Sequence, residues 1–146
     1  MTKPIVVEHS STASAETIYE HLISSKRWVL WQGVSATLQP RPGGLFRMET
    51  PDGRTARGQF IDVVPNQRVV FSWGWTDMPG LPPGSSTVEI DLIPTGQGTL
   101  IRLCHRGLAP DEATAHEVGW RHYLRRLSEA SLGIDPGPDT GPDPTD

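Results

Sequence analysis

Cysteine, lysine and long apolar runs are all scarce in this sequence, and each scarcity excludes a class of protein. Cys104 is the only cysteine, so the chain can form neither an internal disulfide nor a cluster of thiolate metal ligands. No apolar run approaches the roughly 18 residues that a membrane-spanning helix requires. The N-terminal residues lack the basic region and long apolar region of a secretory signal. We therefore expect a cytoplasmic protein that is not inserted in a membrane.

An excess of positive charge is also absent. The 146 residues hold 13 lysines and arginines against 17 aspartates and glutamates, a formal net charge of −4. Four of the acidic residues follow Ile134, so the chain up to that point is formally neutral. A protein without a basic excess has little with which to neutralise phosphate groups. We expect no nucleic-acid partner.

The length suits one domain, followed by a segment of different composition. Residues 135–146 contain four prolines and no hydrophobic residue. Such a segment cannot bury enough apolar surface to offset the entropy lost on ordering. We predict a domain over residues 1–134 and a disordered acidic tail over residues 135–146.

Capping residues predict the helices. A β-branched strand over residues 5–9 is followed by Ser14, a good N-cap, and then by Ser24 or Ser25, either of which suits a second short helix. Near the C-terminus, Pro110 suits a first helical position and Gly133 suits the position after a helix end. Between them, His116, Trp120, Tyr123, Leu124 and Leu127 form one apolar stripe at helical spacing. Arg125 and Arg126 are cations suited to the last turn.

Between these helical regions, apolar residues recur at every second position, which is typical of half-buried strands in an antiparallel sheet. The pattern covers residues 45–50, 57–64, 69–75, 87–93 and 100–105. It breaks over residues 61–64, which indicates a bulge before Pro65. The sequence therefore predicts an α+β fold, in which a curved antiparallel sheet of about six or seven strands surrounds a long C-terminal helix.

Several short motifs support the same arrangement when they are taken together. They are SAETIY at residues 14–19, RPGGLF at 41–46, GQF at 58–60, RVVFSW at 68–73, LCHRG at 103–107 and HEVGW at 116–120. In order and spacing they resemble the START-like, or Bet v1-like (SRPBCC), superfamily, and within it the family of the activator of Hsp90 ATPase. The resemblance implies a helix-grip fold. One departure is Gln32, where the family often has a second tryptophan after the one at Trp31.

The resemblance does not imply one function, because the superfamily includes carriers of hydrophobic ligands, polyketide cyclases and a chaperone activator. We favour a cavity between sheet and helix that binds a hydrophobic or aromatic small molecule, gated by residues 76–85, without a cofactor or metal. For any one tryptophan, the alternative is that it simply fills the core. The expected lining is Trp31, Phe46, Met48, Phe60, Phe71, Trp73, Trp75, Val88, Ile90, Ile101, Leu103, His105, His116, Trp120 and Tyr123.

Two other functions stay open. A cyclase-like enzyme would use His105, His116 or Tyr123 to move protons, and it loses these candidates if protein partners saturate all three. A chaperone-binding module is less favoured. The motif at 116–120 is half of a zinc-protease helix, but Trp120 stands where the second histidine is required, so we exclude that activity. A strand such as residues 87–93 could support a homodimer.

Overall fold

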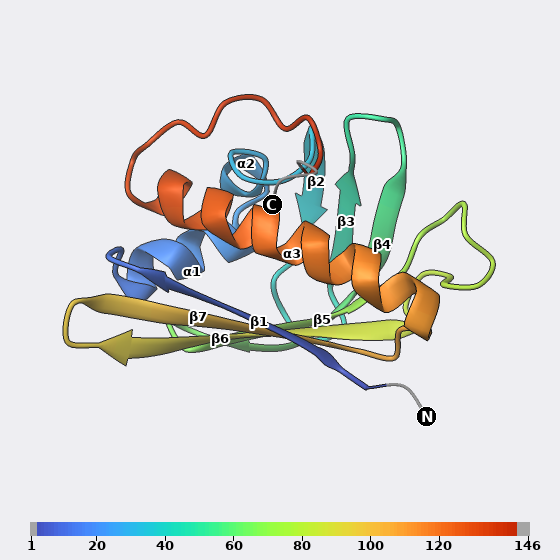
Figure 1. Cartoon of the computed structure of the whole chain (residues 1–146), viewed down its shortest axis with the longest axis horizontal. Helices are drawn as coiled ribbons and strands as arrows, with labels where there is room; N and C mark the ends of the chain where they lie inside the picture. Colours follow the sequence, from blue (N-terminus) through green and yellow to red (C-terminus); the bar gives the residue numbers. More distant parts are fainter. Residues whose placement is uncertain (1–2, 143–146) are drawn as a thin grey trace.

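The computed structural model describes residues 3–142, which form seven strands and three helices. In chain order these are β1 (Ile5–Ser11), α1 (Ala15–Ile23), α2 (Ser25–Trp28), β2 (Ser35–Leu38), β3 (Leu45–Glu49), β4 (Thr55–Val64), β5 (Arg68–Trp73), β6 (Ser86–Thr95), β7 (Gly98–Arg106) and α3 (Pro110–Ser131). The strands form one antiparallel sheet, and α3 lies across one of its faces (Figure 1). The predicted helix-grip fold is confirmed. No helix within residues 3–142 is long and apolar enough to span a membrane.

The helix boundaries follow the capping residues. The Ser14 hydroxyl accepts a hydrogen bond from the Thr17 N–H at 3.2 Å, and Ser24, rather than Ser25, does the same for Arg27. These side chains satisfy N–H groups that have no partner inside the first helical turn. At the other end of the chain, α3 begins at Pro110. Gly133, just beyond it, adopts the left-handed conformation that the sequence predicts, with φ 77°.

The strand order is β1-β7-β6-β5-β4-β3-β2. The predicted bulge is present as a register shift between Phe60 and Asp62 in the pairing of β4 with β5. Strand β2 was not predicted, because its four residues are too few for a clear alternation. The strand over residues 87–93 lies in β6, between β7 and β5, so its backbone offers no free edge for a second copy. The edge strands of the sheet are β1 and β2.

We call the sheet together with α3, which lies across one of its faces, the grip. Aromatic rings fill the middle of the space between them. Phe46 stacks on Phe71 with ring centroids 4.2 Å apart, and Trp28 packs edge-on against both rings. Leu124 and Leu127 of α3 are fully buried in the same core cluster. Burial of this kind removes on the order of 150–250 Å² of each aromatic side chain from water. The centre of the grip is therefore packed core.

Part of the expected tail lies against the body, and we call this part, residues 135–142, the C-terminal segment. Figure 1 shows it leaving α3 and running back over α2 toward β2. The Arg126 guanidinium donates hydrogen bonds to the backbone oxygens of Pro136 and Gly137, at 2.9 and 2.8 Å. The Asp139 side chain is buried. We expected disorder because the segment has no hydrophobic residue to bury. In the structure, hydrogen bonds from polar groups of the domain hold residues 135–142 instead. Residues 143–146 lie outside the described residues, and the domain boundary at residue 134 stays a prediction.

Candidate functional site

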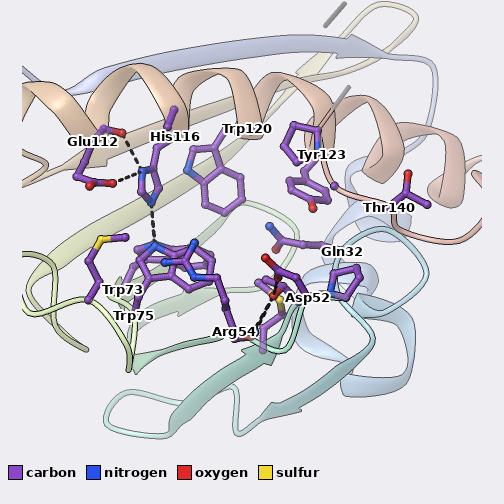
Figure 2. Close-up of a pocket in the computed structure, with 18 residues that line it drawn as sticks. Gln32, Asp52, Arg54, Trp73, Trp75, Glu112, His116, Trp120, Tyr123 and Thr140 are labelled. Carbon is purple, nitrogen blue, oxygen red and sulfur yellow. Dashed lines mark hydrogen bonds and ion pairs between the residues drawn. The ribbon is translucent and has the colours of Figure 1, made fainter. Parts of the chain in front are cut away.

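A pocket of about 340 Å³ opens at one end of the grip (Figure 2). Its walls come from α3, from the ends of β3 and β4 with the turn between them, from β5 and the connection after it, and from the C-terminal segment. The lining residues are Gln32, Met48, Thr50, Pro51, Asp52, Arg54, Trp73, Trp75, Met78, Glu112, Ala115, His116, Gly119, Trp120, Tyr123, Thr140, Gly141 and Pro142. The volume falls within the range of small-molecule sites.

The structure brings together six of the fifteen residues that we expected to line a cavity. They are Met48, Trp73, Trp75, His116, Trp120 and Tyr123. The other nine do not border the pocket and are buried in the core: Trp31, Phe46, Phe60, Phe71, Val88, Ile90, Ile101, Leu103 and His105. Of the expected gate over residues 76–85, Met78 reaches the pocket. The pocket therefore borders fewer of the expected residues and lies at one end of the sheet face.

His116 faces the pocket from α3 and is held as a neutral ring. Its Nδ1 lies 2.9 Å from the backbone oxygen of Glu112, and its Nε2 receives the indole N–H groups of Trp73 and Trp75 at 3.4 and 3.2 Å. An indole N–H can only donate, so Nε2 carries no proton and Nδ1 donates to Glu112. Burial lowers the pKa of His116. A proton on Nε2 would break both indole contacts.

His105, on β7, lies behind the His116 ring and is also held neutral, with its proton on the other ring nitrogen. Its Nδ1 accepts a hydrogen bond from the Trp120 indole at 3.0 Å. Its Nε2 donates to the Ser86 hydroxyl at 2.8 Å, and that hydroxyl donates to the backbone oxygen of Trp73. Burial, together with the neighbouring His116, lowers the pKa of His105 to about 3. The two imidazole rings lie 5.3 Å apart, edge to face.

Tyr123, one turn beyond Trp120, is paired with the C-terminal segment. Its hydroxyl donates to the two carboxylate oxygens of Asp139, at 3.0 and 3.1 Å. The same carboxylate accepts the backbone N–H groups of Gly33 and Gly141, at 2.7 and 2.9 Å. Burial and the Asp139 charge raise the pKa of the Tyr123 hydroxyl, so the phenol stays protonated. All three candidate proton-transfer residues thus have protein partners.

Charged groups lie at the rim of the pocket. The Arg54 guanidinium sits over the Trp75 ring, 4.2 Å from its centroid, and its Nε lies 3.1 Å from a carboxylate oxygen of Asp77. Figure 2 shows the Arg54 side chain extending to the rings of Trp73 and Trp75, and Asp52 across the opening from Tyr123. A cation over an indole face is attracted by the ring's electrons, and here it covers part of the Trp75 surface. Among the described residues, no group of three His, Cys, Asp or Glu side chains could hold a metal ion.

Sequence reasoning missed several lining residues. The sequence singles out Gln32 only as a departure from the family pattern, and it gives no comparable signal for Asp52 or Arg54. Residues 140–142 were assigned to a disordered tail. Gly119 gave a signal, because glycine within a helix costs about 1 kcal/mol relative to alanine. Among residues 3–142, a side-chain carbon added at Gly119 would come within 4 Å of Pro142 alone, at 3.8 Å.

A family model and solved structures of similar proteins point to the same family for this chain. The model of the family described as activator of Hsp90 ATPase homolog 1-like protein matches residues 12–131. The solution structure of an AHSA1-like protein from Rhizobium etli is 43% identical, covers 96% of this chain and 89% of that chain, and has a TM-score of 0.74. The Aha1 dimer structure from Colwellia psychrerythraea is 19% identical and shares the fold, with a TM-score of 0.80 over 93% of this chain and all of that chain.

A human relative has a longer chain. The activator of 90 kDa heat shock protein ATPase homolog 1 from Homo sapiens is 25% identical over 122 residues, which make up 84% of this chain. The chain spans about a third of that relative's length, since the match covers 35% of it. The match of the family model runs from just after β1 to the end of α3 and leaves out the C-terminal segment. The chain belongs to the activator of Hsp90 ATPase homolog 1-like family.

Proposed function

We propose that this protein binds a small apolar or aromatic molecule in the pocket at the end of the grip. The observation that carries the proposal is the wall formed by Trp73, Trp75 and Trp120, whose indole N–H groups are all hydrogen-bonded to histidine nitrogens. Because those polar atoms are satisfied inside the protein, the rings present mainly carbon to the pocket. Rigid aromatic walls of this kind favour an apolar ligand.

The cyclase-like alternative has less support. A general acid or base needs a proton that it can exchange with the ligand. His116 uses both ring nitrogens within the protein, His105 lies behind the pocket, and the Tyr123 hydroxyl donates to Asp139. Moving a proton through any of them would first break these contacts. We therefore favour binding over catalysis.

A second copy of the chain and a chaperone are the two protein partners to be considered. The Colwellia psychrerythraea relative is described as a dimer, and β1 and β2 are the edges at which a second copy could pair. Sedimentation of the purified protein would give the oligomeric state. Binding to a chaperone is the less favoured alternative, because this chain matches only a third of the human activator. A pull-down with purified Hsp90 tests it directly.

The test of ligand binding uses N-phenyl-1-naphthylamine, a neutral fluorophore that brightens in apolar surroundings. We expect saturable binding at one site per chain. Gly119→Leu is the informative variant, because leucine suits a helix and its side chain would project into the pocket from α3. We expect it to weaken binding at least about tenfold, since it removes volume and apolar contact from the ligand.

Gly119→Ala is the matched control. Its methyl group takes little of the pocket, and the gain in helix propensity should stabilise the protein by up to about 1 kcal/mol. Binding should be close to that of the unmodified protein, and chemical unfolding gives the stability. Absence of saturable binding, or equal binding to the leucine variant, would contradict the proposed function.

A further inference from the structure

Gln32 is the most unusual residue of the pocket wall, because it is polar, buried and without a hydrogen-bond partner for its side-chain oxygen. Only 3% of its surface is exposed, and within residues 3–142 the amide oxygen Oε1 accepts no hydrogen bond. Figure 2 shows the side chain reaching into the pocket between Tyr123 and Asp52. A buried amide oxygen without a partner destabilises a protein, and an apolar side chain of the same length would avoid that cost.

The backbone on both sides of Gln32 is fixed. The preceding carbonyl, of Trp31, accepts a hydrogen bond from the buried Arg126 at 2.9 Å. The following residue, Gly33, donates its N–H to Asp139 at 2.7 Å and has φ 77°. A side-chain carbon at Gly33 would lie 2.6 Å from the backbone oxygen of Glu49, so this position requires glycine. The amide is therefore presented to the pocket by a rigid segment, as in a preorganised binding site.

The neighbouring polar groups have partners of their own. The Tyr123 hydroxyl is bound to Asp139, and Asp52 accepts a hydrogen bond from the Thr50 hydroxyl. His116 is occupied by two indoles and by the backbone of Glu112. Rotation about the last side-chain bond of Gln32 exchanges its oxygen and nitrogen, so the amide can offer the pocket either an acceptor or a donor. A hydroxyl group, which both donates and accepts, suits either orientation.

We propose that Gln32 is the polar recognition residue of the pocket and that the ligand is an aromatic molecule bearing a hydroxyl group at the end that faces it. The aromatic part lies against Trp73, Trp75 and Trp120, and the hydroxyl pairs with the Gln32 amide. This inference rests on the proposed function and adds the chemical class of the ligand. Sites that bind a buried hydroxyl discriminate strongly against analogues that lack it.

The experiment combines two probes with two proteins. 2-Naphthol and 2-methylnaphthalene have the same shape and differ in a hydroxyl against a methyl group. Each is titrated as a competitor of N-phenyl-1-naphthylamine on the wild type and on Gln32→Met, with Gln32→Leu as a second variant if the first does not fold. The ratio of the two affinities in each protein cancels the greater hydrophobicity of the methyl compound. Met78→Leu, an apolar change elsewhere in the lining, is the control.

We expect the preference for 2-naphthol to be about three- to tenfold greater in the wild type than in Gln32→Met, and unchanged in Met78→Leu. Without ligand, Gln32→Met should melt at the same temperature as the wild type or higher, because it removes a buried amide oxygen that lacks a partner. Equal ratios in the two proteins, or a clearly lower melting temperature for Gln32→Met, would overturn the inference. In that case, saturable fluorophore binding to the wild type would still support the proposed function. Absence of fluorophore binding to the wild type would contradict the proposed function itself.

Discussion

The histidines show how individual residues set the chemistry of this protein. Indoles bind one nitrogen of His105 and of His116, and oxygen atoms bind the other. The sequence predicted that both residues face the space between the sheet and the C-terminal helix, one from each wall. It could not predict their protonation, because that depends on which donors and acceptors from four separate elements meet in the fold.

Acid should destabilise the protein through His105. Its pKa in the fold is about 3, against 6.5 for an unperturbed histidine, so between these values the unfolded chain binds more protons than the folded one. The stabilising effect of the neutral ring is complete above about pH 6.5 and is lost progressively as the pH falls. His116 and His9, whose pKa values are also lowered, act in the same direction.

The size of the effect can be estimated for His105 alone. A shift of one pKa unit corresponds to about 1.4 kcal/mol, so lowering the pH from 6.5 to 5 should reduce the free energy of unfolding by about 2 kcal/mol. Urea unfolding at several pH values measures this. The imidazole resonance of His105, followed by NMR, should show no titration above about pH 4. A midpoint near 6.5 would contradict the neutral network.

At the scale of elements, the strands and helices were predicted well and the C-terminal segment was not. Alternation and capping residues are local signals, so they appear directly in the sequence. The segment over residues 135–142 is held by contacts with Arg126, Tyr123 and Gly33, which composition does not reveal. Arg126 looked suited to the last turn of a helix, but its guanidinium instead joins Trp31 to the C-terminal segment.

Two aspartates of this segment give a matched comparison. Asp139 is buried and accepts from Tyr123 and Gly33, whereas Asp135 is exposed and accepts from Gly137 within the segment. Replacing Asp139 with alanine leaves buried donors without partners, so we expect a loss of about 1–3 kcal/mol in the free energy of unfolding. Asp135→Ala should cost less than about 0.5 kcal/mol. Chemical unfolding distinguishes them, and equal effects would mean that Asp139 does not hold the segment.

At the scale of the whole molecule, the sheet and helix enclose a packed centre with a hollow at one end. The sequence predicted which residues face inward, because alternation defines a face of the sheet. It did not predict how far rings from opposite walls interdigitate, so residues of the packed centre were included in the expected lining of the cavity. Phe46, Phe71 and Trp28 meet in the centre, and the indoles farther along leave space.

Truncating a ring in each region tests this division. Phe71 is fully buried among other rings, so Phe71→Ala should lower the free energy of unfolding by about 3–5 kcal/mol. Trp75 is buried but borders the pocket, so its ring has fewer packed neighbours on that side. Trp75→Ala should therefore cost less stability than Phe71→Ala and should weaken binding of the fluorophore. Urea unfolding and fluorophore titration measure the two effects. A small cost for Phe71→Ala would mean that the centre is not tightly packed.

The placement of the tryptophans gives the molecule a built-in optical reporter. Three of the five indoles border the pocket, and the other two, Trp28 and Trp31, lie against each other in the core, with ring centroids 4.5 Å apart. A molecule that enters the pocket displaces water from the first group and leaves the second unchanged. Intrinsic emission should therefore shift toward the blue on binding, above a constant background, so that libraries of compounds can be screened without any label.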